Sequence, residues 1–186
     1  MSSTTREDVI EMLQRSYCME IETVTNYLAN SINLDGVRAQ QIKESLGGDI
    51  AEEIEHARQL GNRIKQLGGR LRGSASLSLG HQPQPPHDTT NVVGVIKGVI
   101  LMEEAAIEQY HRIIRATQDS DPVTADLCTR LMADEEEHLV LFRGFLKEYE
   151  PDGDRHRQDS EQPPTAAGLP MDTELNSSLT PILGLS

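Results

Sequence analysis

Two well-separated stretches of the chain repeat one pattern of acidic and aromatic residues. In each copy a Glu is followed two helical turns later by a Tyr, and a Glu-x-x-His follows at a nearly equal distance further along. Residues three apart on a helix share a face, so each Glu-x-x-His presents an oxygen and a nitrogen donor together. The repeat therefore predicts two similar helical hairpins with matching groups at matching depths. Its members are Glu20, Tyr27, Glu53 and His56 in the first copy and Glu103, Tyr110, Glu135 and His138 in the second.

The repeated residues form the donor set of a two-metal centre. Four carboxylates and two imidazoles can hold two iron or manganese ions inside a helical bundle. A single Glu-x-x-His would more often belong to a solvated helix face, but two copies at matching spacing favour metal binding. Either Glu103 or Glu104 could face inward, and only Glu103 precedes a Tyr at the same spacing as Glu20. The candidate metal ligands are Glu20, Glu53, His56, Glu103, Glu135 and His138, and Tyr27 and Tyr110 are expected to hydrogen-bond to ligand carboxylates.

Other charged residues near the repeat are expected to lie at the surface. The neighbouring acids would add a negative field that attracts Fe²⁺. Two histidines outside the repeat are expected to be solvated, because they flank the prolines of a polar segment. The third, which follows Tyr110, is expected at the surface, with contact to a metal ligand or a place on the entry route of the metal as the alternative. These acids are Glu22, Glu52, Glu55, Glu136 and Glu137, and these histidines are His81, His87 and His111.

The length, net charge and cysteine content limit the kinds of protein to which the chain can belong. A length of 186 residues favours one domain with a substantial core. The formal charge of −13 argues against nucleic acid or an anionic membrane as a partner and suits a cationic ligand. Cys18 and Cys128 are too few and too far apart for a disulfide framework, so both are expected to pack as small apolar groups. Without a signal peptide or a membrane-spanning run, the expected location is cytoplasmic.

Helical periodicity predicts four long helices. A capping box of Thr4 and Glu7 would begin the first helix, and Asp121 followed by Pro122 would begin the last. Gly47-Gly48 lies inside the second helix and predicts a bend there or close approach by another helix. The predicted helices span about residues 5–30, 36–67, 91–118 and 121–149.

The segment 68–90, rich in Gly, Ser and Pro, is predicted to be a linker between two helical hairpins. A helix of about 27 residues is roughly 40 Å long. A linker of about 23 residues can span more than roughly 70 Å, enough to cross the height of a bundle. The predicted fold class is therefore all-α, a four-helix bundle with one long crossover.

With these ligand positions and this crossover, residues 5–150 resemble the ferritin-like superfamily, and bacterioferritins most closely. The resemblance implies that Glu20 and Glu103 are terminal ligands and that Glu53 and Glu135 bridge two metals. It also implies that each histidine binds one metal. Haem-bearing bacterioferritins carry a Met directly after the ligand Glu of the second helix, where this chain has Ile54. No haem is therefore expected.

The resemblance implies a ferroxidase that oxidises Fe²⁺ to Fe³⁺ with O₂ or H₂O₂ for iron storage or detoxification. It also implies a homo-oligomer, either a dimer or a cage. One alternative is a di-iron or di-manganese peroxidase or catalase of oxidative-stress defence. The chain lacks the four-cysteine centre of classical rubrerythrins, which weakens that version of the alternative. A second alternative is a non-enzymatic adaptor that uses the C-terminal segment.

The C-terminal segment is predicted to be separate from the bundle of residues 1–150. Residues 151–174 have the composition of a flexible linker, and residues 175–186 end in aliphatic side chains. The terminal segment either folds back onto its own bundle or docks to another protein. It resembles the cargo-loading peptides that direct ferritin-like enzymes into encapsulin shells, which would place the protein within an encapsulin nanocompartment.

Overall fold

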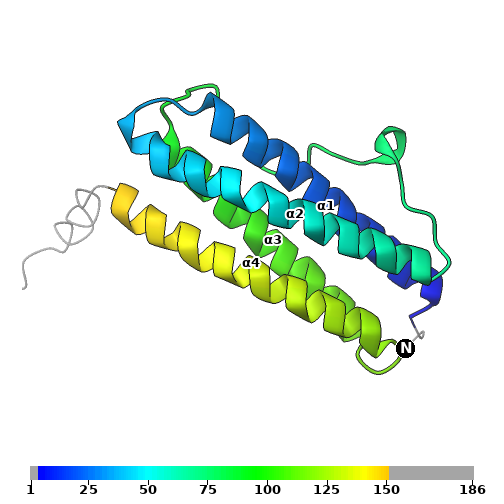
Figure 1. Ribbon diagram of the computed structural model, residues 1–186. Coiled ribbons are helices and arrows are strands. Elements are labelled where there is room, and N and C mark those ends of the chain that lie inside the picture. Colours follow the sequence, from blue (N-terminus) through cyan, green and yellow to red (C-terminus); the bar gives the residue numbers. More distant parts are fainter. Residues whose placement is uncertain (1–3, 151–186) are drawn as a thin grey trace, which may run out of the picture. The chain divides into compact units, whose positions relative to one another are not determined.

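A computed structural model describes residues 4–150 of the chain. This part forms four long α-helices and two short 3₁₀ turns, with no strand among the described residues. Within residues 4–150, no helix combines the length and apolar composition that a membrane span requires. The helices are α1 Arg6–Asn33, α2 Gln40–Gln66, α3 Val92–Thr117 and α4 Pro122–Tyr149, and the 3₁₀ turns are η1 Val37–Ala39 and η2 Ser74–Ser76 (Figure 1).

The helices form two antiparallel hairpins, α1 with α2 and α3 with α4 (Figure 1). The segment between α2 and α3 runs from one end of the bundle to the other, so α3 begins at the end of the bundle where α1 ends (Figure 1). A connection of this length lets the two hairpins lie side by side in one bundle. The predicted all-α four-helix bundle with a long crossover is confirmed.

Two clusters of buried apolar residues hold the bundle together. One cluster includes Leu46, Ile96 and Phe142, and the other includes Leu13 and Ile113. Burial of each such side chain contributes about 1.5–3 kcal/mol, so these clusters account for much of the stability. Along every helix, the segment between the two clusters carries buried polar residues instead. The polar middle of the bundle is therefore enclosed by apolar layers on both sides.

The first helix begins one residue later than the sequence indicates. Thr5 is the N-cap, and its side chain accepts a hydrogen bond from the backbone N–H of Asp8 at 3.2 Å. The Asp8 carboxylate accepts from the backbone N–H of Thr5 at 2.9 Å. The predicted capping box of Thr4 and Glu7 is therefore wrong. The box is formed one residue later, and Asp8 takes the role that was expected of a Glu.

The second helix also differs from its prediction. Gly36 has a φ of +98°, outside the helical region, so α2 begins only at Gln40 after η1. The helix then runs without interruption through Gly47 and Gly48. Within residues 4–150, a Cβ atom at either glycine would meet nothing within 4 Å, so the expected close approach by another of these helices is wrong. The predicted start of α4 is confirmed, since Asp121 accepts from the backbone N–H of Thr124.

Hydrogen bonds to a buried acid on α1 hold the crossover, the segment between α2 and α3, against that helix. Glu22 is only 5 % exposed, and the backbone N–H groups of Gly80 and Gln82 donate to its carboxylate at 2.8 and 2.9 Å. The expectation that Glu22 faces solvent is therefore wrong. Its partners lie far away along the chain, so helical periodicity could not reveal them. Cys18 and Cys128 are buried and free, as expected.

Candidate metal centre

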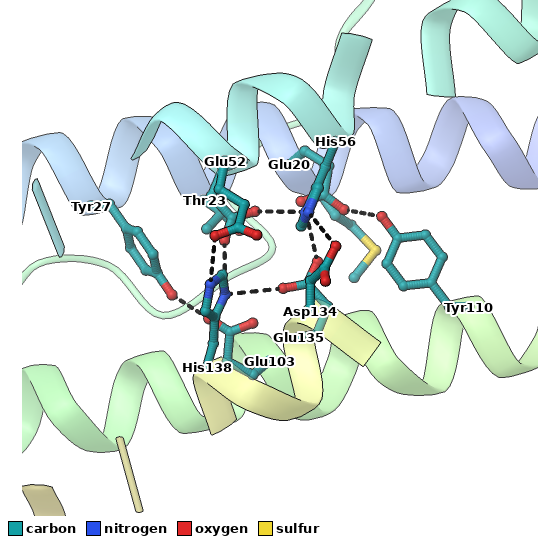
Figure 2. Close-up of polar contacts among 12 residues, drawn as sticks. Glu20, Thr23, Tyr27, Glu52, His56, Glu103, Tyr110, Asp134, Glu135 and His138 are labelled. Atoms are coloured by element: carbon teal, nitrogen blue, oxygen red, sulfur yellow. Dashed lines mark hydrogen bonds and ion pairs between the residues drawn. The ribbon is translucent and has the colours of Figure 1, made fainter. Parts of the chain in front are cut away.

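Six buried side chains from all four helices meet in the polar middle of the bundle (Figure 2). Each is at most 7 % exposed. Their donor atoms form two groups of four, and within each group these atoms lie within 4.8 Å of one another. Glu53 and Glu135 belong to both groups. These six residues, the six-residue centre, are Glu20 from α1, Glu53 and His56 from α2, Glu103 from α3, and Glu135 and His138 from α4.

Both imidazoles direct Nδ1 at the two shared carboxylates. Nδ1 of His56 lies 3.2 Å from Glu135 and 3.6 Å from Glu53. Nδ1 of His138 lies 3.4 Å from each of the same two carboxylates. The contacts are therefore related by an approximate two-fold symmetry, in which α2 corresponds to α4. Each group of four contains one histidine and one carboxylate that the other group lacks. The two remaining carboxylates are common to both groups.

Several donors of this centre have no partner among residues 4–150. Within that range, both carboxylate oxygens of Glu53 and of Glu135 are buried without a hydrogen-bond partner, and so is Nδ1 of each histidine. Buried polar atoms without partners are costly, and the cost is larger for charged groups. Two divalent cations would satisfy all of these atoms, and a mixed oxygen and nitrogen donor set suits iron or manganese. The residues present therefore fit a two-metal site.

The two tyrosines bind the outer carboxylates across the bundle. The Tyr27 hydroxyl on α1 donates to Glu103 on α3, and the Tyr110 hydroxyl on α3 donates to Glu20 on α1 (Figure 2). Each tyrosine is at most 1 % exposed. A hydrogen bond of this kind holds a carboxylate in one orientation and leaves its other oxygen for a metal. The sequence spacing suggested the contact with a ligand carboxylate but not which carboxylate each tyrosine would reach.

The choice between the adjacent acids on α3 follows from their burial. Glu103 is 2 % exposed and lies in the centre. Glu104 is exposed and accepts from Arg143 on α4 at 2.7 Å. His81 and His87 are not fully buried, nor is His111. None of these three histidines belongs to a group of potential metal donors among the described residues.

Burial and neighbouring groups shift the pKa values of the carboxylates in the centre. Burial raises the pKa of Glu20 and Glu103 well above the usual range, and their neighbours Glu135 and Glu53 raise it further. Burial also acts to raise the pKa of Glu53, but the adjacent His138 and His56 outweigh it and lower the value to about 2.

The histidine pKa values shift in the opposite sense. Burial acts to lower them, but contacts with Glu135 and Glu53 raise the pKa of His56 to about 10 and that of His138 to about 12. Both imidazoles are therefore protonated at neutral pH when no cation is bound. A cation that binds Nδ1 must displace these protons.

Two acids that were not predicted as site residues contact the histidines from outside. Nε2 of His56 lies 3.3 Å from Asp134, and Nε2 of His138 lies 3.4 Å from Glu52 (Figure 2). The repeat contained a signal for both, because each acid stands directly before a Glu-x-x-His motif. The sequence analysis predicts a surface position for Glu52 and makes no prediction for Asp134.

Comparison with known proteins supports a common architecture. Residues 10–150 match the family model described as a ferritin-like domain. Over 173 residues, covering 88 % of this chain and 90 % of the relative, the chain is 25 % identical to a bacterioferritin from Desulfovibrio desulfuricans. Over 144 residues, covering 75 % and 77 %, it is 28 % identical to a DNA protection during starvation protein from Pyrococcus furiosus.

The fold is also similar to a solved bacterioferritin from Desulfovibrio desulfuricans, described with its diiron site in different catalytic states. The TM-score is 0.69 at 22 % sequence identity, and the match covers 91 % of this chain and 96 % of that one. At this identity the likeness concerns the fold alone.

Proposed function

The chain belongs to the ferritin-like domain family, and on that premise we propose that it is a ferroxidase that oxidises Fe²⁺ to Fe³⁺ at the six-residue centre. The observation that carries the proposal is the set of buried donors from all four helices, of which those on α2 and α4 include atoms without a hydrogen-bond partner in the described part of the chain. Iron storage or detoxification is the role that such chemistry serves. The diiron site named for the Desulfovibrio relative supports the same assignment.

The proposed roles of the residues follow from their positions. Glu53 and Glu135 would hold both ions, because each belongs to both donor groups. Glu20 and Glu103 each bind one ion at the outer side, held in orientation by Tyr110 and Tyr27. His56 and His138 each bind one ion through Nδ1, and the apolar layers on both sides restrict water. Two Fe²⁺ ions supply two electrons, enough to reduce one O₂ to H₂O₂, or one H₂O₂ to two waters, with uptake of two protons.

The decisive experiment measures metal content and the oxidant consumed per Fe²⁺ added. A ferroxidase that stores iron oxidises a large excess of Fe²⁺ and retains the product. A peroxidase or catalase destroys H₂O₂ without net oxidation of iron, and a di-manganese enzyme is purified with manganese. A non-enzymatic adaptor neither oxidises iron nor destroys H₂O₂. Any of these last results would contradict the proposal.

Metal affinity is expected to fall on acidification. The raised pKa values of His56 and His138 mean that both imidazoles are protonated at pH 7 in the metal-free chain, so binding must release protons. Each displaced proton weakens affinity about tenfold per unit of pH decrease. Calorimetric titration with Co²⁺ at pH 6, 7 and 8, in buffers of different ionisation enthalpy, measures both effects. Equal affinity at all three pH values would contradict the expected proton release.

The protein is expected to be free of haem. Ile54 occupies the position that the bacterioferritin resemblance assigns to a haem-ligating Met, and its side chain cannot bind iron. Ile54 is 51 % exposed on α2. Protein purified from its own host should show no Soret absorption. A Soret band at stoichiometric intensity would contradict this prediction.

We infer a homo-oligomer, a dimer or a cage, from apolar side chains at the surface. Leu28 and Ile32 on α1 are 49 % and 66 % exposed and stand one turn apart, and α2 exposes Ile54. Association of copies would remove these side chains from water, at about 25 cal/mol for each Å² buried.

The C-terminal segment lies outside the described residues, and its role stays a proposal. We propose that residues 1–150 are the catalytic bundle, that residues 151–174 serve as a linker and that residues 175–186 are a peptide that docks to an encapsulin shell in the cytoplasm. Deletion of residues 175–186 should leave Fe²⁺ oxidation unchanged, and the same peptide fused to an unrelated soluble protein should co-purify with a shell protein from the native host. If deletion lowers the melting temperature of the bundle and the fusion binds no shell protein, the segment packs on its own fold instead.

A further inference from the structure

A hollow of about 350 Å³ lies between α1, the crossover and α3. Small-molecule sites in proteins are concavities of about this size, with mostly apolar walls and a few polar groups. None of the residues of the six-residue centre lines this hollow, so it is a separate feature of the fold. The argument below concerns this crossover hollow, whose walls include Arg15, Cys18, Met19 and Glu22 of α1, Gln82 of the crossover and Ala105 of α3.

The hollow exists because the crossover is fastened to α1 at two points and is longer than the distance between them. The Gln14 side chain donates to the carbonyl of Arg70 at 2.7 Å, and Glu22 accepts from the backbone N–H of Gly80. Eight residues of helix between Gln14 and Glu22 measure about 12 Å. The ten residues from Arg70 to Gly80 can extend over roughly 33 Å. The crossover therefore stands away from α1 around η2 (Figure 1).

One end of the hollow carries a buried carboxylate with an oxygen that has no partner. Oε1 of Glu22 accepts from the backbone N–H groups of Gly80 and Gln82 and from the side chain of Gln84 at 3.4 Å. Oε2 accepts no hydrogen bond within residues 4–150, although Glu22 is only 5 % exposed and lines the hollow. A buried carboxylate without full hydrogen bonding is costly. Oε2 is therefore suited to a charged donor, such as an ammonium group.

The other end of the hollow carries a guanidinium group. Arg15 stands two helical turns before Glu22 on α1 and lines the same hollow. The nearby Arg72 forms an ion pair with Glu11, whereas Arg15 has no ion pair among the described residues. A guanidinium group binds a carboxylate through two parallel hydrogen bonds. Arg15 is therefore suited to an organic carboxylate.

Apolar groups lie between these two charged ends. Arg15 and Glu22 are seven residues apart, which corresponds to about 10 Å along the helix axis. Cys18 and Met19 stand between them on α1, and Ala105 lines the hollow from α3. Such side chains favour contact with hydrocarbon rather than with water. The order along the hollow is thus acidic, apolar and basic.

We propose that the crossover hollow binds a small linear zwitterion, with its ammonium group at Glu22, its carboxylate at Arg15 and a short hydrocarbon chain between them. The site goes beyond the proposed ferroxidase function, because it uses none of the residues of the six-residue centre. An α-amino acid such as alanine carries its two charges too close together to reach both ends. An ω-amino acid separates them, as the spacing of Arg15 and Glu22 requires.

The experiment is calorimetric titration of the full chain with ε-aminocaproate as the probe. We expect saturable binding of one molecule per chain. Caproate lacks the ammonium group and hexylamine lacks the carboxylate, so each should bind about 10–100-fold more weakly, the loss expected for one hydrogen-bonded charge. Alanine should also bind more weakly than ε-aminocaproate.

Three substitutions place the site. Glu22→Gln keeps an oxygen for the N–H groups of the crossover but removes the charge, and Arg15→Gln removes the other charge; each should weaken binding about 10–100-fold. Ala105→Phe fills the hollow from an exposed position and should abolish binding. Arg112→Gln, which removes an exposed guanidinium elsewhere on α3, should bind like the unaltered chain. Circular dichroism checks that each variant is folded.

The outcomes decide the proposal without reference to iron oxidation. The absence of saturable binding would overturn it, and so would equal binding of ε-aminocaproate, caproate and hexylamine. Unchanged binding in the Ala105→Phe protein would place the probe elsewhere and also overturn it. If Glu22→Gln loosens the crossover and lowers the melting temperature, Arg15→Gln and Ala105→Phe still test the site, because both change exposed positions.

Discussion

Replacement of Glu53 by Ala is expected to abolish rapid Fe²⁺ oxidation while the helices remain folded. Glu53 belongs to both donor groups, so its loss removes a ligand from both metal positions at once. Loss of an outer partner of a ligand typically costs about 10–100-fold in affinity or activity, so loss of a shared ligand should cost on the order of 100-fold or more. Glu53 belongs to neither of the two apolar clusters that hold the bundle together, so the helices should remain folded without its carboxylate.

The measurement is the initial rate of Fe²⁺ oxidation, followed by absorbance and by oxygen uptake, with circular dichroism as the test of folding. Glu137→Ala is the matched control, because it removes an exposed acid that directly precedes His138 in sequence but is not part of the buried centre. Its rate should equal that of the unaltered chain. An unaltered rate in the Glu53→Ala protein would contradict the assignment of the six-residue centre as the site of Fe²⁺ oxidation.

Metal loading is expected to produce the second large effect, a rise in thermal stability. The centre buries several polar atoms that have no hydrogen-bond partner within the described residues and that two cations would satisfy, so cations should bind the folded chain and not the unfolded one. A ligand present at about 100 times its dissociation constant stabilises a protein by about 2.7 kcal/mol per site. For a chain of this size, about 1 kcal/mol corresponds to roughly 2–4 °C, so two sites should raise the melting temperature by about 10–20 °C.

Differential scanning calorimetry of chelator-treated protein, with and without added Co²⁺, measures this shift. The rise should reverse when the chelator is restored. The Glu53→Ala protein should show little of it, and the Glu137→Ala protein should show all of it. A melting temperature that does not respond to any divalent cation would contradict the presence of a two-metal site in the folded chain.

Helical periodicity and the doubled Glu-x-x-His pattern were sufficient to predict the architecture. Residues three and four apart must share a face of a helix, and a long linker between two hairpins permits few arrangements. The same local rule selected the six donors, because Glu20, Glu103 and the two motifs repeat at nearly equal intervals. Helix ends were less certain, as Thr5 and Gln40 show, because capping depends on the conformation of single residues.

Contacts between helices could not be predicted in this way. The partners of Glu22 lie in the crossover, and the acceptor of each tyrosine lies on the other hairpin. Asp134 stands directly before a Glu-x-x-His motif, but its contact with His56 across the bundle follows only from the tertiary structure. The sequence by itself determined which residues share a helix face, because that follows from the repeat of the α-helix. Only the tertiary structure decided which faces meet and at what height, because that depends on how the side chains of all four helices pack together.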